Sequence, residues 1–349
     1  MPEDPEKQDK LICIDKNKTY KKEHFFIQDF AKKVEYIKLE TNDNCFIGKE
    51  HELESIRATK TDIFINEKHV VYRFSRKDGK FLNQIGKHGA GPQEFASKMS
   101  IMIDENKQEV LFHDFMKNKI LVYSFEGVFK REIDIPVLTQ LELVDENTFA
   151  AVTNYPNTEV PGFGLYSLTD GKLIKKLSGY YTSRSGITYN MVPKYIIARQ
   201  NKGEAFFSTY VTDTIFSINK NGRTPRYALL PPNNGKTMKE KTSCSTPFIL
   251  CDTDQFANIQ VYGIKMNKSF DSYIINKQTG EITQGFIVDK EYSGGVFAFN
   301  TGIDNEFAAL HYAHALKGRE EGGMLFGKLK EITKTLDEED NPVVVIANF

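Results

Sequence analysis

The feature that most limits the fold of this chain is a β-hairpin signal that recurs five times. Each copy is a short run of alternating apolar residues followed by a tight turn that contains glycine. The turn glycines are Gly79, Gly127, Gly171, Gly222 and Gly280, and successive copies are 48, 44, 51 and 58 residues apart. Asp-Gly and Asn-Gly pairs, which occur in three of the turns, supply the positive φ angles that tight hairpins require. A strand-built repeat of this length is typical of a β-propeller, in which each repeat forms one blade.

The two ends of the chain predict how such a ring closes. Residues Val34–Leu39 alternate cleanly between apolar and polar and precede the first repeat, while Val343–Ile346 form an apolar run at the far end. A propeller closes when an N-terminal strand completes the last blade. Five hairpins and one blade shared between the ends therefore predict an all-β, six-bladed propeller with four-stranded blades. We expect residues 30–349 to form this single domain and the polar residues 1–29 to be an N-terminal tether.

One stretch near the C-terminus follows helical spacing instead of alternation. Its apolar residues fall on one face of a helix. They are Leu325, Phe326, Leu329, Ile332 and Leu336. The spacing predicts one short amphipathic helix over residues 323–336, inserted before the final strand. Acidic residues 337–340 follow, and we expect the helix to end before them, because acidic side chains at a helix C-terminus oppose the helix dipole.

The composition excludes several classes of protein. With 40% hydrophobic and 27% charged residues, the chain has the composition of a globular protein. The 46 basic and 47 acidic residues nearly cancel and form no basic block, so we expect no nucleic-acid partner. No apolar stretch approaches about 18 residues, so we expect no transmembrane helix, and membrane association only through a lipid anchor. We expect a monomer.

The loop that follows the first hairpin has the spacing Gly-x-x-Gly-x-Gly-Pro-x-Glu-Phe. Its fixed residues are Gly86, Gly89, Gly91, Pro92, Glu94 and Phe95. This loop resembles a signature of the six-bladed β-propeller lipoproteins of Gram-negative gut anaerobes, which are distant relatives of NHL-repeat propellers. Residues 213–216 and 340–346 are also similar to that family, and the resemblance extends from about residue 30 to residue 349.

The resemblance implies an exported protein of the cell envelope, either periplasmic or anchored to the outer membrane by a lipid. It implies no catalytic residues, because members of the family are mostly uncharacterised. The polar N-terminus carries neither a hydrophobic leader nor a lipobox. Two expectations therefore stand side by side: an envelope protein whose leader was removed, or a cytoplasmic protein that starts at Met1.

Two glycine-rich segments are candidate anion sites. In the loop 86–95, backbone N–H groups near Lys87 and His88 could face an anion. We favour a crossover between blades, because no helical pattern follows to supply a helix N-terminus. The segment 322–329 approaches a phosphate-binding loop, but Leu329 replaces the Ser or Thr that would hold magnesium, so we expect no nucleotide there.

Metal-binding and disulfide signals are weak. His311 and His314 have the spacing of two ligands on one element, but a metal site needs a third ligand. Asp252 and Asp254 would suit Ca²⁺ only with further oxygen ligands. We therefore predict no cofactor, with Ca²⁺ as the alternative. Cys244 and Cys251 are close enough in sequence for a hairpin disulfide, although free buried thiols are commoner in a chain of this size.

A clear scaffold without a recognisable reaction centre predicts a non-enzymatic binding propeller. Its ligand would be a small molecule, a glycan or a protein, recognised by loops on one face. Tyr-rich segments 154–163 and 179–195 offer aromatic rings that stack on sugars or peptides. The ligand-binding candidates are Tyr155, Tyr181, Arg184, Tyr189 and His88. The alternative is a metal-dependent hydrolase or lyase, lactonase-like, with its site on the propeller axis. A third reading is a structural partner in an envelope complex.

Overall fold

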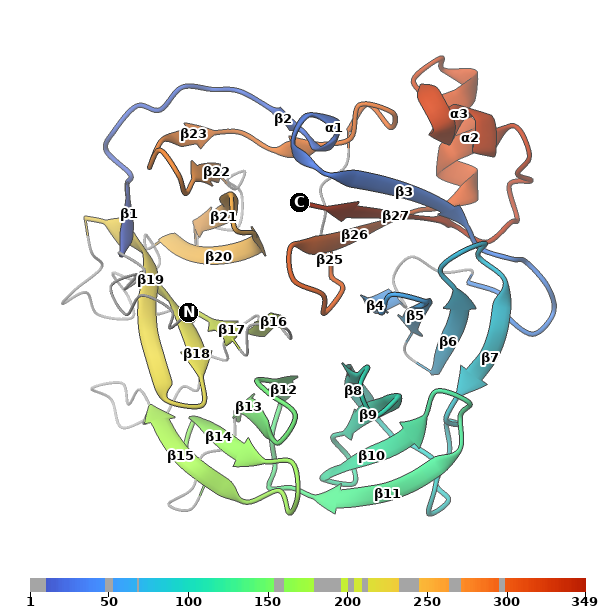
Figure 1. Ribbon diagram of the computed structural model, residues 1–349, viewed down its shortest axis with the longest axis vertical. Coiled ribbons are helices and arrows are strands. Elements are labelled where there is room, and N and C mark those ends of the chain that lie inside the picture. Colours follow the sequence, from blue (N-terminus) through green and yellow to red (C-terminus); the bar gives the residue numbers. More distant parts are fainter. Residues whose placement is uncertain are drawn as a thin grey trace, which may run out of the picture.

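Six sheets, each containing one four-stranded blade, surround a central axis in the computed structural model (Figure 1). The structure describes residues 11–47, 53–67, 69–153, 160–178, 196–199, 204–208, 213–231, 245–263, 271–294 and 299–349. In each blade the first strand lies next to the axis and the fourth lies at the rim, and neighbouring strands within a blade are antiparallel. The predicted six-bladed propeller with four-stranded blades is confirmed.

The blades follow one another along the chain. Blade 1 contains β4 (Leu53–Ala58), β5 (Asp62–Glu67), β6 (Val70–Ser75) and β7 (Phe81–Ile85). Blade 2 contains β8 (Lys98–Asp104), β9 (Glu109–Asp114), β10 (Lys119–Ser124) and β11 (Phe129–Asp134). Blade 3 contains β12 (Gln140–Leu143), β13 (Thr148–Val152), β14 (Phe163–Ser167) and β15 (Leu173–Ser178). Blade 4 contains β16 (Ile196–Arg199), β17 (Glu204–Phe207), β18 (Thr214–Asn219) and β19 (Gly222–Leu230). Blade 5 contains β20 (Ser245–Asp252), β21 (Phe256–Gly263), β22 (Asp271–Asn276) and β23 (Ile282–Gln284). Blade 6 contains β25 (Phe299–Asn300), β26 (Glu306–His311), β27 (Val343–Asn348) and β3 (Lys33–Lys38).

Blade 6 closes the ring with strands from both ends of the chain. β3, near the N-terminus, pairs antiparallel with β27, near the C-terminus, from Lys33 opposite Asn348 to Lys38 opposite Val343. Figure 1 shows the blue β3 beside the red β27. The predicted closure by an N-terminal strand is confirmed, and the first and last blades of the ring meet at a seam between blades 6 and 1.

The core consists of six apolar clusters, one for each contact between neighbouring blades. β5 illustrates the pattern. Ile63 and Ile65 pack in the cluster between blades 6 and 1, while Phe64 packs in the cluster between blades 1 and 2. Since successive side chains of a strand point to opposite faces, a strand buried on both faces has a nearly continuous apolar sequence.

The five predicted turn glycines all have positive φ angles, between 69° and 139°. Two of them also allow a close approach between blades. A Cβ atom on Gly79 would lie 1.9 Å from the carbonyl oxygen of Lys38, and one on Gly171 would lie 1.9 Å from that of Asp134. Each of these hairpins therefore abuts the outermost strand of the preceding blade, which only glycine permits.

The N-terminal segment runs along the rim before it enters blade 6 (Figure 1). β1 (Ile12–Asp15) adds a fifth, parallel strand to β19 of blade 4. β2 (Phe25–Phe26) then pairs with β24 (Ile287–Val288) beyond blade 5, and α1 (Ile27–Phe30) leads into β3. Ile14 is fully buried. Within the residues 1–29 that we expected to be a tether, the segment from Ile12 onward thus pairs with the propeller.

Two short helices precede the final strand. α2 spans Ala313–Glu321 and α3 spans Gly327–Thr333. The predicted C-terminal helix corresponds to α3 within narrower bounds, because the chain turns at Gly323, where φ is +67°. Leu329 and Leu336 are buried as predicted, whereas Phe326 is 54% exposed. Among the described residues, no helix is long and apolar enough to cross a membrane.

Candidate functional site

A polar cavity of about 600 Å³ lies at the seam between blades 6 and 1. It opens on the face of the ring that carries the first-to-second and third-to-fourth strand connections, which in blade 1 are residues 59–61 and 76–80. We call this the turn face and the cavity the seam cavity. Its lining residues are Lys33, Glu35, Lys60, Thr61, Ser75, Arg76, Lys77, Ile303, Glu306 and Asn348.

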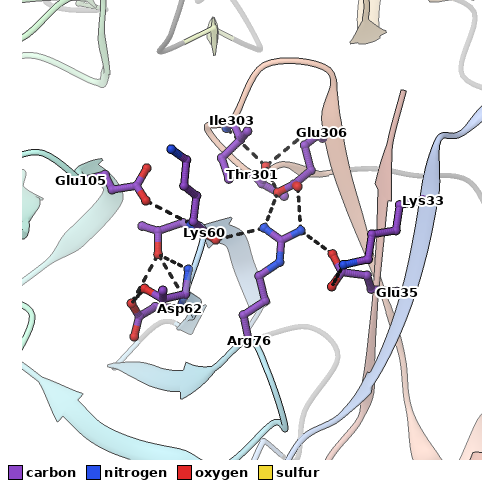
Figure 2. A network of polar contacts seen from close by, with 11 residues as sticks. Lys33, Glu35, Lys60, Asp62, Arg76, Glu105, Thr301, Ile303 and Glu306 are labelled. Carbon is purple, nitrogen blue, oxygen red and sulfur yellow. Dashed lines mark hydrogen bonds and ion pairs between the residues drawn. The ribbon is translucent and has the colours of Figure 1, made fainter.

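Arg76 organises this site (Figure 2). Its Nη2 donates to Glu35 Oε1 at 2.6 Å and to Glu306 Oε2 at 2.7 Å. Its Nη1 donates to Glu306 Oε1 at 3.1 Å and to the carbonyl oxygen of Thr59 at 3.0 Å. Arg76 belongs to blade 1, Glu35 lies on β3 and Glu306 begins β26. One guanidinium therefore joins strands from both chain ends to the first blade through charge-assisted hydrogen bonds.

The carboxylate of Glu35 is held in its ionised form. Burial opposes the ionisation of Glu35, but hydrogen bonds from Arg76 and Lys33 outweigh it and lower its pKa. Burial disfavours the charge of Arg76, but the hydrogen bonds and negative charges of Glu306 and Glu35 outweigh it and raise the pKa of Arg76. Glu306 also accepts a hydrogen bond from the hydroxyl of Thr301, at 3.0 Å. The pairing of Glu35 with Arg76 therefore favours the charged form of both side chains, an arrangement that suits the orientation of a charged ligand.

The remaining cations give the cavity a positive balance. Four cationic residues (Lys33, Lys60, Arg76 and Lys77) and two carboxylates line it, a formal charge of +2. Lys60 donates its backbone N–H to Glu105 Oε1, and Figure 2 shows its side chain extended with no contact drawn to the amino group. Within the described part of the chain, no salt bridge engages the amino groups of Lys60 or Lys77. These two amines are free to meet an anion.

The propeller axis is crossed by an ion pair. Arg57 on β4 contacts Glu142 on β12 at 2.5 Å and donates to the carbonyl oxygen of Asn300 on β25 at 3.2 Å. Burial raises the pKa of Glu142, and the nearby Arg57 opposes this shift. Among the described residues, no group of three or more His, Cys, Asp or Glu could hold a metal ion.

Of the five predicted ligand-binding residues, one lies within the described part of the chain. Four of them lie outside the described residues. They are Tyr155, Tyr181, Arg184 and Tyr189. The fifth, His88, is exposed in the loop after β7, with its ring centroid 4.6 Å from that of His69. It does not contribute to the seam cavity.

The glycine-rich loop 86–95 is bound to its own glutamate. Glu94 Oε2 accepts the backbone N–H of Gly91 at 2.9 Å, and Glu94 Oε1 lies 2.8 Å from the amino group of Lys87. Lys117 donates to the carbonyl oxygens of both Gly91 and Glu94. The carboxylate of Glu94 therefore takes the place that a bound anion would occupy. This agrees with our interpretation of the loop as a crossover between blades.

The candidate metal ligands and the segment that approaches a phosphate-binding loop take part in the packing and turns of the propeller. His311 is buried on β26 and stacks on Tyr292 at 3.8 Å, whereas His314 is exposed on α2. Buried Asp252 accepts a hydrogen bond from the hydroxyl of Tyr227 at 2.5 Å and pairs with Lys277. The segment 322–329 forms the turn between α2 and α3 and the first residues of α3.

Of the two cysteines that are close enough in sequence for a hairpin disulfide, one lies within the described residues. Cys251 is a free, buried thiol, and burial raises its pKa above the ordinary range. Cys244 lies outside the described residues.

No pattern in the sequence pointed to the seam cavity. Its residues span Lys33 to Asn348, and closure of the ring brings them together. The one local signal is Arg76, which comes just before the Asp-Gly turn at residues 78–79 and follows an apolar strand. A cation at that place can be interpreted only once its partners on β3 and β26 are known.

The fold and this cavity define a six-bladed propeller with a polar site between its first and last blades. The chain matches the family described as "Domain of unknown function (DUF4934)" over residues 11–348 and belongs to that family. No curated protein matches it.

Two solved structures are similar to the chain. One, described as "Putative exported protein" from Bacteroides fragilis NCTC 9343, has 18% identity and a TM-score of 0.69, and the match covers 97% of this chain and 100% of that one. The other, a member of the DUF4221 family from Bacteroides vulgatus ATCC 8482, has 11% identity and a TM-score of 0.50, with 91% of this chain and 98% of that one covered. At these identities the likeness concerns the fold alone.

Proposed function

We propose that this protein is a non-enzymatic binding propeller of the cell envelope that recognises a carboxylated glycan or small molecule at the seam cavity. The observation that carries the proposal is the charge arrangement. The cavity has a formal charge of +2, its two carboxylates are already paired with Arg76, and two lysine amines are free at its rim.

The chemistry of the lining favours an anion with hydroxyl groups. Lys60 and Lys77 supply point charges for carboxylates, while Thr61, Ser75 and Asn348 supply hydroxyl and amide groups that pair with sugar hydroxyls. The volume of about 600 Å³ lies within the range of small-molecule sites. A short acidic oligosaccharide satisfies both the charge and the hydrogen-bonding groups.

Binding is favoured over catalysis because the central ion pair of the site, Glu35 with Arg76, is stabilised in its charged form. Glu35 has a lowered pKa and Arg76 a raised one, so both remain charged around neutral pH. A general acid or base works best with a pKa near the working pH. The charges of Glu35 and Arg76 therefore serve to orient a ligand.

The cellular location is part of the proposal. The sequence resembles exported lipoproteins, and a structural relative is described as exported. Fractionation of cells that express the complete natural gene tests this point. Recovery of the protein in the envelope fraction agrees with it, and recovery in the cytoplasm contradicts it.

The binding proposal is tested by calorimetric titration with digalacturonate, which carries two carboxylates, against neutral digalactose. We expect only the acidic disaccharide to bind, with an affinity that falls as salt is added. Replacing Lys60 or Lys77 with alanine should weaken binding about fivefold each, because each removes one partly exposed charged contact.

Lys172→Ala is the matched control. Lys172 is an exposed lysine in the corresponding turn of blade 3, where it pairs with Asp170. We expect this variant to bind as the unmodified protein does. Equal binding of the neutral sugar, or unchanged affinity in the Lys60/Lys77 double variant, would overturn the proposal.

A further inference from the structure

A second pocket, of different chemistry, opens on the other side of blade 6. It lies between blades 5 and 6 and the N-terminal segment and has a volume of about 160 Å³. We call it the apolar pocket. Four phenylalanine rings, those of Phe25, Phe30, Phe256 and Phe349, line it together with isoleucine and amide side chains.

Aromatic rings form much of the wall. The centroids of Phe25 and Phe30 lie 5.2 Å apart, those of Phe30 and Phe256 lie 6.4 Å apart, and those of Phe256 and Phe349 lie 5.0 Å apart at 90°. Ile274 is buried behind them. An engineered cavity of about 150 Å³ lined by Leu, Ile and Phe stays dry and binds benzene. The apolar pocket has a similar volume, and its wall consists of Phe and Ile side chains, so it can hold one phenyl-sized group.

The mouth of the pocket is polar but uncharged. Gln255 and Gln278 are exposed there, and their side-chain amides make no hydrogen bond within the described residues. The Asn276 side-chain oxygen accepts the backbone N–H groups of Gln278 and Thr279. Among the residues that the structure describes, no ionisable side chain lines the pocket. Since an amide both donates and accepts hydrogen bonds, this mouth suits a neutral amide and disfavours a charge, which would lose hydration without a partner.

The two sites differ because they use opposite faces of one blade. Asn348 lines the seam cavity and the adjacent Phe349 lines the apolar pocket. Neighbouring residues of an extended chain point to opposite sides, one toward blade 1 and the other toward blade 5. Both openings lie on the turn face, since Gln255 belongs to the first-to-second connection of blade 5 and Gln278 to its third-to-fourth connection.

We infer that the apolar pocket binds a phenyl-sized apolar group carried next to a neutral amide, as in an aromatic amino-acid amide or a phenylalanine residue of a peptide. The aromatic wall takes the ring, and Gln255 and Gln278 meet the amide. This site does not depend on the anion site that we propose at the seam.

The test is an NMR titration of protein labelled at the isoleucine δ1 methyl groups. The probe is N-acetyl-phenylalaninamide, with N-acetyl-alaninamide as the small control. We expect ring-current shifts at Ile27, Ile274 and Ile287 with millimolar affinity, as a single-ring ligand permits. Ile303 lines the seam cavity and should not shift. Its methyl group separately reports the acidic disaccharide, so failure of one proposal is distinguishable from failure of the other.

Matched variants locate the effect. Phe30 is 39% exposed at the mouth, so Phe30→Ala leaves the buried wall intact and should weaken binding about fivefold, the worth of one aromatic contact. Gln278→Ala, a change on an exposed turn, should also weaken it. Phe46→Ala is the control, because Phe46 is 52% exposed and lies outside the pocket.

Two outcomes would overturn the inference: pocket methyl groups that do not respond at about 10 mM probe, which is above the expected dissociation constant, or equal responses to the alanine and phenylalanine amides. A pentapeptide with phenylalanine at its centre distinguishes the two ligand sources. Tighter binding of the peptide assigns the site to a peptide segment, and weaker binding assigns it to a small amide.

Discussion

Replacement of Arg76 with methionine would remove a side chain that joins blade 1 to strands near both chain ends. The change takes away three hydrogen bonds to carboxylates and leaves Glu306, whose side chain is 3% exposed, with an uncompensated charge. Removing one partner of a buried ion pair costs about 3–5 kcal/mol. With an unfolding entropy of about 2.1 cal/mol/K per residue, this lowers Tm by roughly 4–7 °C for a chain of 349 residues.

Urea titration and differential scanning calorimetry measure this change. Arg131→Met is the matched control, because Arg131 pairs with Glu109 in blade 2 but is 41% exposed and joins no chain ends. We expect Arg131→Met to lower the free energy of unfolding by about 1 kcal/mol or less. The double variant Arg76→Met with Glu306→Gln should regain stability, since no buried charge remains unpaired. If Arg76→Met cost no more than Arg131→Met, our account of the seam would be refuted.

Two further predictions concern turns and pH. Gly171→Ala should lower the free energy of unfolding by about 3 kcal/mol or more, because the new Cβ would lie 1.9 Å from the Asp134 carbonyl oxygen. Gly280→Ala, with open space around it and φ of +75°, should lower it by only about 1 kcal/mol. Equal losses of unfolding free energy in urea titrations would contradict the close approach at Gly171. Burial lowers the pKa of His113 to about 4 against the charge of Asp114. The unfolded chain takes up this proton below about pH 6.5, so stability is full above that pH and falls by up to about 3 kcal/mol toward pH 4. His113→Phe should make urea unfolding less dependent on pH in this window, and an unchanged slope would show that the histidine is protonated in the folded state.

The repeating part of the fold could be predicted because local chemistry determines it. Gly79 and Gly171 sit in hairpins whose turn residues and flanking alternation are visible within ten residues. Closure could be predicted for a similar reason. Val34–Leu39 and Val343–Ile346 are strand-like runs without a partner in any repeat, and the structure pairs them.

The irregular parts of the fold could not be predicted in the same detail. β1 is four residues long and has only two apolar side chains facing inward, too few for a period to be recognised. α2 has no clear apolar face, since its sequence AHALKGREE buries only Ala313 and Leu316. The tertiary setting, and not local propensity, holds these elements in place.

The seam cavity could not be predicted from the sequence, because its residues meet only when the ring closes. Glu35 and Glu306 are 271 residues apart, and neither lies in a recognisable motif. Their convergence on Arg76 depends on ring closure and on the register between β3 and β27. A single sequence shows the strands but not which of their charges will share a partner.

Closure by β3 also has a consequence for biosynthesis. The partner of Lys33–Lys38 is the strand Val343–Asn348, so about 310 residues must be made between the two halves of this sheet. At roughly 5–20 residues per second, a ribosome needs about 15–60 s for that length. During this time the hydrogen-bonding edge of the early strand is without its partner, and blades 1 to 5 can form only an open arc. The nascent chain is therefore exposed to mispairing until its last strand is released.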